Sequence, residues 1–406
     1  MTGSPKVQPR GLIAAVSALA ISLLAQPLAA QVFVRDAMPY PADRLAFRQM
    51  PALFPSAPVA RAGVPAPLEQ GSSIDVAGLS FMDGEGRQTT GGAYLARENV
   101  DALIVLHRGK VVFETYAAGM KAGDPHIWQS MTASLTGLIA EVLASEGSVD
   151  LKRTAGDYAP EIAETVWGRA TLRNLLDMQL NIEESAAFAA APPTEAAGAA
   201  DFLTSLKEPG VKQAGENGKV WYYTSNAPLA VGVALERATG KRWAELVHDI
   251  VWSKIGAEAD ASMFVDQAGR ASAGGGFSST LRDAARFADM IAAGGKAGET
   301  QVVPEAVIAT LRKNAGNAGL TKRGNVALPV QRSILSFRSY WYQANDGTGA
   351  VEGLGEFGQH IYANPNDRIA IVQFGSYGHP GVSPMNWTRL TEAIVAKLTE
   401  SASARR

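Results

Sequence analysis

Residues 130–137 read Ser130-Met131-Thr132-Ala133-Ser134-Leu135-Thr136-Gly137, and a helical pattern continues from there to Glu146. Apolar side chains recur at the spacing of one helix face, at Leu135, Leu138, Ile139, Val142 and Leu143. Gly147 follows and predicts the end of the helix. Ser130 therefore stands at the beginning of a predicted helix, where unpaired backbone N–H groups and the positive dipole end stabilise negative charge.

Strand-like segments lie on both sides of this helix in the chain. Residues 100–107 and 111–116 are rich in β-branched residues, and Arg108-Gly109-Lys110 joins them, a pattern typical of a hairpin. Residues 340–343, 358–363 and 369–374 are further predicted strands, and a turn over residues 364–367 joins the last two. Helical patterns cover residues 171–178, 229–239, 281–293 and 387–398.

This order of elements predicts an α/β (α+β) fold. A sheet lobe would form from residues of about 85–130 and 270–400, with a mostly helical lobe of about 131–270 inserted in it. Residues 31–84 are expected to be an extended lead-in, since their first half is rich in Pro and Ala. Residues 401–406 are expected to be a frayed tail.

The amino-acid composition argues against several classes of function. The 406 residues carry a net charge of −2, which gives no field to attract nucleic acid or an anionic membrane. Five histidines and no cysteine argue against a structural zinc site and exclude disulfides and thiol nucleophiles. We expect no metal and no other cofactor.

The N-terminus has the pattern of a secretory signal. Lys6 and Arg10 precede an apolar stretch over residues 11–25, and small residues stand before a cleavage point after Ala30. The alternative, a membrane anchor, needs about 20 apolar residues and finds fewer here. We therefore expect a periplasmic or secreted protein without stable membrane insertion after cleavage.

Five motifs occur in an order that resembles a known superfamily. They are Trp128-Gln129-Ser130-Met131-Thr132, the helical run 170–178, Trp221-Tyr222-Tyr223-Thr224-Ser225-Asn226, the glycine-rich run 273–283 and Gly358-Gln359-His360-Ile361-Tyr362. Together they resemble the serine hydrolases of the β-lactamase and penicillin-binding superfamily. The group that includes 6-aminohexanoate-dimer (nylon oligomer) hydrolases, class C β-lactamases and related esterases is most similar. The resemblance covers about residues 85–400 and implies an antiparallel sheet flanked by helices, with the active site between the two lobes.

The resemblance implies roles for three positions. Ser130 matches the nucleophile, and a tyrosine of the helical lobe would share its proton relay and protonate the leaving group. Tyr222 and Tyr223 are both candidates, and the family spacing to Gly232 selects Tyr223. A lysine one helical turn after the serine would be the base, because a serine hydroxyl is a poor nucleophile until a base takes its proton. Ala133 stands at that position.

Further positions are implied to line the site. Ser225 and, with lower rank, Asn226 match polar residues that hydrogen-bond there. Glu356-Phe357-Gly358 matches the strand that borders the acyl pocket, so a backbone N–H near Gly358 would complete an oxyanion hole with that of Ser130. Phe357 removes a polar side chain that could bind a substrate carboxylate. Trp128, Trp221, Trp341 and Tyr342 are expected to form an apolar pocket, with core packing as the alternative.

Three explanations of Ala133 remain open. It is an engineered replacement of lysine, a natural change in a lineage without catalysis, or a sign that another group serves as the base. The sequence predicts a serine hydrolase that cleaves small linear amides or short peptides through an acyl-Ser130 intermediate. A carboxylesterase of the same fold and a non-catalytic ligand-binding homologue are the alternatives, and small molecules rather than nucleic acid are the expected partners.

Overall fold

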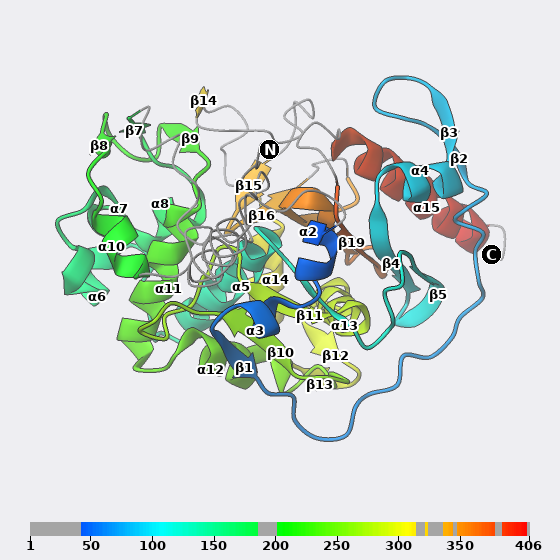
Figure 1. Ribbon diagram of the computed structural model, residues 1–406, viewed down its shortest axis with the longest axis horizontal. Helices are drawn as coiled ribbons and strands as arrows, with labels where there is room; N and C mark the ends of the chain where they lie inside the picture. The colour runs from blue at the N-terminus through cyan, green and yellow to red at the C-terminus, as the bar shows by residue number, and fades with distance from the viewer. Residues whose placement is uncertain are drawn as a thin grey trace, which may run out of the picture.

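The computed structural model describes residues 42–185, 201–313, 321–323, 336–343, 347–377 and 384–403. Its largest sheet has seven antiparallel strands that come from both ends of this range (Figure 1). In spatial order they are β15 (Ser336–Arg338), β16 (Trp341–Gln343), β17 (Val351–Gly355), β18 (Gln359–Asn364), β19 (Ile369–Gly375), β4 (Val100–His107) and β5 (Lys110–Tyr116). The pairing of β19 with β4 joins the two halves of the chain, and the sheet is antiparallel, as the predicted fold class requires.

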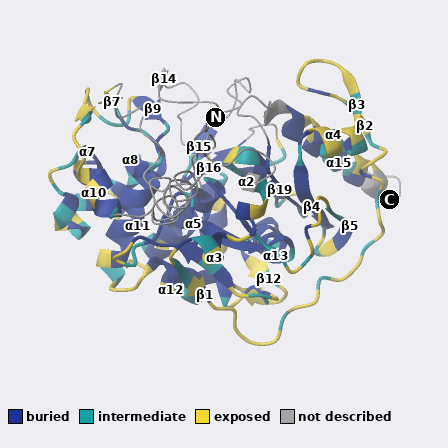
Figure 2. Ribbon diagram, in the orientation of Figure 1, coloured by how far each residue is buried: buried dark blue, intermediate teal, exposed yellow. Residues whose placement is uncertain are grey.

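Helices cover both faces of this sheet. Residues of β4 alternate between two apolar clusters, so Leu103 and Val105 pack in one and Ile104 and Leu106 in the other. The first cluster includes side chains of α4 (Gly91–Arg97) and α15 (Pro384–Ser403), and the second those of α5 (Met131–Ser145) and α13 (Leu281–Ala292). Figure 2 shows β4 buried between these layers.

A second antiparallel sheet contains β6 (Pro125–Ile127), the strand that leads into α5. Its strands lie in the order β1 (Ser56–Val59), β10 (Ala261–Phe264), β11 (Phe277–Thr280) and β6. The stretch predicted as an extended lead-in thus contributes β1, and it also contains α2 (Ala42–Ala46), α3 (Met50–Leu53) and β2 (Ser80–Met82). Strand β6 ends three residues before Ser130, so this sheet positions the start of α5.

The helical lobe packs beside α5. Its helices and helical turns are α6 (Ala155–Tyr158), η2 (Pro160–Ile162), α7 (Val166–Arg169), α8 (Leu172–Leu176), α10 (Phe202–Lys207), α11 (Asn226–Thr239), α12 (Trp243–Val247) and the π-helical turn η4 (His248–Trp252). Helix α14 (Glu305–Leu311) lies against α5 from the C-terminal half. The predicted helices over residues 171–178, 229–239, 281–293 and 387–398 are confirmed as α8, α11, α13 and α15, with ends shifted by a few residues.

Short strands and turns complete the described fold. They are β3 (Gln88–Thr90), which pairs with β2; β7 (Ile182–Glu184) and β8 (Val211–Gln213); β12 (Lys296–Ala297) and β13 (Thr300–Gln301); β14 (Thr321–Arg323) beside β9 (Val220–Tyr222); and η6 (Glu356–Gly358). No helix within the described residues is long and apolar enough to cross a bilayer.

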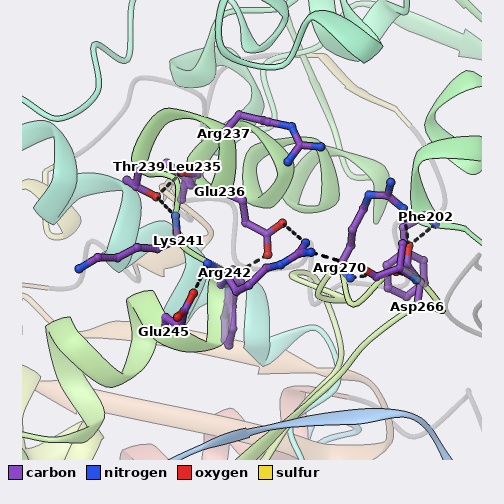
Figure 3. Close-up of polar contacts among 12 residues, drawn as sticks. Phe202, Leu235, Glu236, Arg237, Thr239, Lys241, Arg242, Glu245, Asp266 and Arg270 are labelled. Carbon is purple, nitrogen blue, oxygen red and sulfur yellow. Dashed lines mark hydrogen bonds and ion pairs between the residues drawn. The ribbon is translucent and has the colours of Figure 1, made fainter.

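Polar side chains at the C-terminal end of α11 tie it to its neighbours (Figure 3). Glu236 accepts a hydrogen bond of 2.9 Å from the backbone N–H of Trp243, which caps the start of α12. Nearby, Arg270 contacts Asp201 at 2.8 Å and Asp266 at 3.1 Å. Asp266 also accepts from the N–H of Phe202, so this cluster fixes the start of α10 to the segment that contains Asp266 and Arg270.

Candidate active site

Ser130 lies where the chain turns sharply from β6 into α5. The preceding Gln129 has a φ of 49°, a left-handed conformation that few non-glycine residues adopt. Ser130 is half-buried and its side chain does not cap α5. Among the hydrogen bonds of the described residues, neither its hydroxyl nor its N–H is a donor, so both groups are available at the helix N-terminus.

Ala133 lies one helical turn after Ser130 and is 6% exposed. A lysine from elsewhere in the chain would have to reach Ser130 to replace the missing base. Every lysine whose exposure the structure describes is exposed, and several pair with surface carboxylates, as Lys110 does with Glu69. Among the lysines whose exposure the structure describes, none is buried beside Ser130.

The structure separates the two candidate tyrosines. Tyr222 is buried and its phenol is hydrogen-bonded to Glu184; burial, followed by the charge of Glu184, raises the pKa of Tyr222. Tyr223 is half-buried, with its ring 6.2 Å from that of Trp221. Consecutive residues of an extended chain point to opposite sides, so only one of the two can face a given site.

Ser225 and Asn226 stand at the N-terminus of α11. Ser225 is half-buried and makes no side-chain cap on this helix. Asn226 is buried, and its backbone N–H donates to Oγ1 of Thr224 at 3.4 Å. Tyr223 and Ser225 thus occupy the short connection between β9 and α11, and Asn226 is the first residue of α11.

Gly355, the last residue of β17, lies close to the start of α5. A Cβ atom on Gly355 would come within 2.4 Å of the Trp128 carbonyl oxygen and 3.1 Å of the Met131 nitrogen. One pleat earlier, a Cβ on Gly353 would meet Oγ of Ser134 at 2.9 Å. The end of β17 therefore runs directly past Ser130, and only glycine allows this approach.

Phe357 and Gly358 lie beyond this approach, in a turn where both have positive φ. The ring of Phe357 packs on Phe47 with 5.3 Å between centroids. A Cβ on Gly358 would be 2.6 Å from the ring of Tyr377. The backbone beside Ser130 is thus that of Gly355, three residues before the predicted Gly358. The Gly353-x-Gly355 spacing is the sequence signal that could have indicated it.

Two of the aromatic residues expected in a pocket are core residues. Trp128 is fully buried, and its indole N–H donates to Oγ of Ser279 at 2.9 Å. Trp341 is also fully buried and donates to the Ser134 carbonyl at 2.8 Å. For both, the structure favours the core-packing alternative. The rings near Tyr223 are instead Trp221, Phe337, Tyr340 and Tyr342.

A buried ionic network joins α5, α8 and the β15–β16 turn. Arg173 pairs with Glu141 at 2.8 Å, and Arg338 pairs with Asp177 at 3.0 Å. Asp177 also accepts from the N–H of Ser339 at 3.0 Å. Burial raises the pKa of Asp177, while the two arginines oppose that rise. The described residues contain no cluster of His, Asp or Glu suited to hold a metal ion.

The sequence model of the Beta-lactamase family matches residues 93–394, about three quarters of the chain. The chain belongs to the β-lactamase family. Its fold and family make it a hydrolase of β-lactamase fold, in agreement with the resemblance seen in the sequence motifs.

Individual relatives agree with this assignment. The 6-aminohexanoate-dimer hydrolase of Paenarthrobacter ureafaciens is 28% identical over 380 residues, which cover 90% of this chain and 92% of the relative. A structure assigned as a 6-aminohexanoate-dimer hydrolase from Bacillus anthracis has a TM-score of 0.78 at 23% identity and covers 90% of this chain and 96% of its own. A class C β-lactamase from Rhodobacter sphaeroides has a TM-score of 0.55 at 12% identity and covers 76% and 97%. These two structures support the fold.

Proposed function

We propose that this β-lactamase-family chain has the scaffold of a periplasmic or secreted serine hydrolase for small linear amides or short peptides. The observation that carries the proposal is the position of Ser130, at the N-terminus of α5 and beside the backbone of Gly355. The relative from Paenarthrobacter ureafaciens is named for hydrolysis of 6-aminohexanoate dimer, a linear amide, which favours amides over esters as the substrate.

In the proposed reaction, Oγ of Ser130 attacks the substrate carbonyl carbon and its proton passes to a base. The oxyanion that forms accepts hydrogen bonds from the N–H of Ser130 and from a backbone N–H at the end of β17. The C–N bond then breaks, and Tyr223 gives a proton to the leaving amine and takes up the proton that the base received from Ser130. Water attacks the acyl-Ser130 ester, which releases the acid and restores the serine.

A second candidate function follows from Ala133. Ala133 is buried, and none of the lysines whose exposure the structure describes is buried, so the hydroxyl of Ser130 lacks an evident base among these residues. A non-catalytic ligand-binding homologue would have this arrangement. A labelled fluorophosphonate separates the two functions, because it forms an adduct on Ser130 only if that serine is nucleophilic.

Restoring the base is the most direct test of the catalytic proposal. In Ala133→Lys the amine would project along the same face of α5 towards Ser130. Burial and the helix N-terminus would lower the pKa of this lysine and make a neutral amine available near pH 7. We expect hydrolysis of p-nitrophenyl esters and linear amides to rise by at least about 10²-fold, on the order of the rate lost with a missing base.

Two variants control this experiment. Ser130→Ala in the Ala133→Lys background should abolish the gain. Ala144→Lys adds the same charge to the half-exposed, C-terminal part of α5 and should give no gain. If Ala133→Lys folds normally and shows no increase over the whole substrate panel, the catalytic proposal is wrong and the binding homologue replaces it.

The same background tests the choice of tyrosine. Tyr223→Phe should reduce turnover by about 10²-fold or more without lowering the melting temperature, since it removes the proposed proton donor. Tyr222→Phe should be mild in turnover, because its phenol is engaged with Glu184. The opposite ranking in kcat would show that Tyr222 is the acting residue.

A further inference from the structure

The hairpin β15–β16 ends in an unusual buried turn. Its two turn residues, Ser339 and Tyr340, have φ values of 51° and 65° and are 0% and 2% exposed. Two-residue turns with positive φ at both positions favour Asn-Gly, because a side chain at either position is strained. A tyrosine in this strained conformation suggests a specific role for its side chain.

Contacts from the helical lobe hold this turn in place. Oγ of Ser134 donates to the Tyr340 carbonyl at 2.7 Å, and the Tyr340 N–H donates to the Leu176 carbonyl at 3.1 Å. A Cβ on Gly137 would lie 3.3 Å from Cδ2 of Tyr340. The ring of Tyr340 thus lies against α5 one turn after Ala133, on the same helix face.

Tyr340 belongs to an aromatic cluster that also includes Tyr223. The centroid of Phe337 lies 6.3 Å from that of Tyr340, 4.7 Å from that of Tyr342 and 5.5 Å from that of Trp221. Trp221 in turn contacts the half-buried Tyr223. The cluster therefore includes the tyrosine that we propose as the proton donor in the reaction at Ser130.

Three hydrogen-bond donors in this cluster are buried without a partner in the structure: the hydroxyls of Tyr340 and Tyr342 and Nε1 of Trp221. Their residues are 2%, 5% and 5% exposed. Buried polar groups in native proteins are nearly always paired. Three unpaired donors in one cluster therefore indicate that a bound ligand supplies the acceptor. Tyr94, another buried tyrosine, shows the usual arrangement, since its hydroxyl bonds to Gln373 at 2.9 Å.

The surrounding charges determine which acceptor fits. Burial raises the pKa of both phenols, and Tyr223 adds to the rise in each, so Tyr340 and Tyr342 remain protonated donors within electrostatic reach of Tyr223. The charge of the Asp177 carboxylate also raises the pKa of Tyr340. The nearby Arg173 and Arg338 are already paired with carboxylates. The Asp177 carboxylate would repel an anionic ligand, and this network has no unpaired arginine to neutralise the ligand's charge. A neutral carbonyl oxygen is not repelled and needs no cationic partner.

We propose that Tyr340, Tyr342 and Trp221 form a subsite that binds an uncharged carbonyl oxygen carried on a linear apolar chain. The proposal deepens the proposed function and rests on it for the identity of the bond that is cleaved. A substrate would place a second amide or ester carbonyl among these donors, with its methylene chain against the aromatic rings and its scissile carbonyl at Ser130. The specificity would then be for neutral, multiply amide-linked chains over free carboxylates.

Binding measurements with the unmodified chain test the subsite without requiring turnover. N-Methylhexanamide should bind in isothermal titration, and sodium hexanoate should bind at least about tenfold more weakly. Tyr340→Phe and Tyr342→Phe should each weaken amide binding about three- to tenfold, the usual effect of one lost neutral hydrogen bond. Their melting temperatures should stay equal or rise, because neither variant breaks a protein hydrogen bond.

Control variants distinguish loss of the subsite from a general loss of stability and from failure of the proposed hydrolase function. Tyr94→Phe should lower the melting temperature without changing amide affinity. Ser130→Ala should keep amide affinity. If hexanoate binds as tightly as the amide, if both Phe variants bind normally, or if the amide does not bind, the subsite is overturned even where fluorophosphonate labels Ser130. If the amide binds as expected and Ser130 of Ala133→Lys is neither labelled nor active, the subsite stands and the proposed hydrolase fails.

Discussion

His360, on β18, packs against α15 in a setting that makes its protonation unfavourable. Its ring stacks on Trp387 at 4.6 Å, and neither ring nitrogen has a hydrogen-bond partner in the structure. Tyr377 lies 6.5 Å away between ring centroids, and Glu352 on β17 is hydrogen-bonded to the indole of Trp387. Burial lowers the pKa of His360 to about 3.

The consequence is a measurable pH dependence of stability. The unfolded chain binds a proton at this histidine near pH 6.5 and the folded chain only near pH 3, so the unfolding free energy falls as pH drops through that interval. The contribution is at most about 1.4 kcal/mol per pH unit. In His360→Phe this part of the dependence should disappear, as measured by urea unfolding at pH 7 and pH 4.5.

His248 supplies the comparison, because it is a half-exposed histidine bonded to the Ala60 carbonyl. His248→Gln should leave the difference in unfolding free energy between the two pH values unchanged. Equal pH dependence in the unsubstituted chain and in His360→Phe would show that water or a rearrangement satisfies the buried imidazolium.

At the scale of elements, the close contact of α5 with the β15–β16 turn fixes the position of the helix that begins after Ser130. A Cβ on Gly137 would lie 1.9 Å from the Ser339 carbonyl oxygen, which is far inside van der Waals contact. Ser339 also donates from its hydroxyl to Glu141, and Trp341 donates to the Ser134 carbonyl. Helix α5 therefore holds Ser130 at its N-terminus and the strained turn along its side.

Gly137→Ala tests this contact. In a helix interior, alanine is normally more favourable than glycine by about 1 kcal/mol. Here the added methyl group must displace the Ser339 backbone, so we expect a net loss of about 1–3 kcal/mol in the free energy of unfolding. Gly123→Ala, where an added Cβ meets nothing within 4 Å, should change stability by less than about 0.5 kcal/mol. A higher melting temperature for Gly137→Ala would show that the two elements separate easily.

At the scale of the whole molecule, residues near the N-terminal end of the described chain are tied to the large sheet. Arg44 and Arg48, from α2 and the turn after it, pair with the buried carboxylate of Asp101 on β4. Asp101 also contacts His126 at 3.2 Å on β6. Removal of both arginines would leave a buried carboxylate without its cationic partners, which is strongly destabilising.

The ion pairs of Arg44 and Arg48 with Asp101 limit how far along the chain a leader can be cleaved. Cleavage after Ala30, as the N-terminal pattern predicts, leaves Arg44 and Arg48 in the mature protein. Intact-mass analysis after expression with the leader in a Gram-negative host should give residues 31–406. A matched form that starts after residue 50 should be insoluble or unfolded. Recovery of the full-length chain from the cytoplasm as soluble protein would contradict the predicted export. The predicted leader itself lies outside the described residues.

Local patterns in the sequence were sufficient for much of the fold. The helix that starts after Ser130 and the β4–β5 hairpin depend on contacts between residues near each other in the chain, so periodicity and turn residues predicted both. The order of strands and helices was sufficient for the two-lobed fold class. Ser130, Ala133 and Tyr223 were also found as candidates from the sequence, through motif order.

Only the tertiary structure decided which backbone and which rings lie near those candidates. Gly355, rather than Gly358, lies beside Ser130 because a turn with two positive φ values redirects the chain between them. Trp128 and Trp341 fill the core, whereas Tyr340 and Tyr342 lie in the cluster that includes Tyr223. These contacts join residues more than 100 positions apart, and the face on which each side chain emerges depends on strand register and turn geometry, which no local pattern encodes.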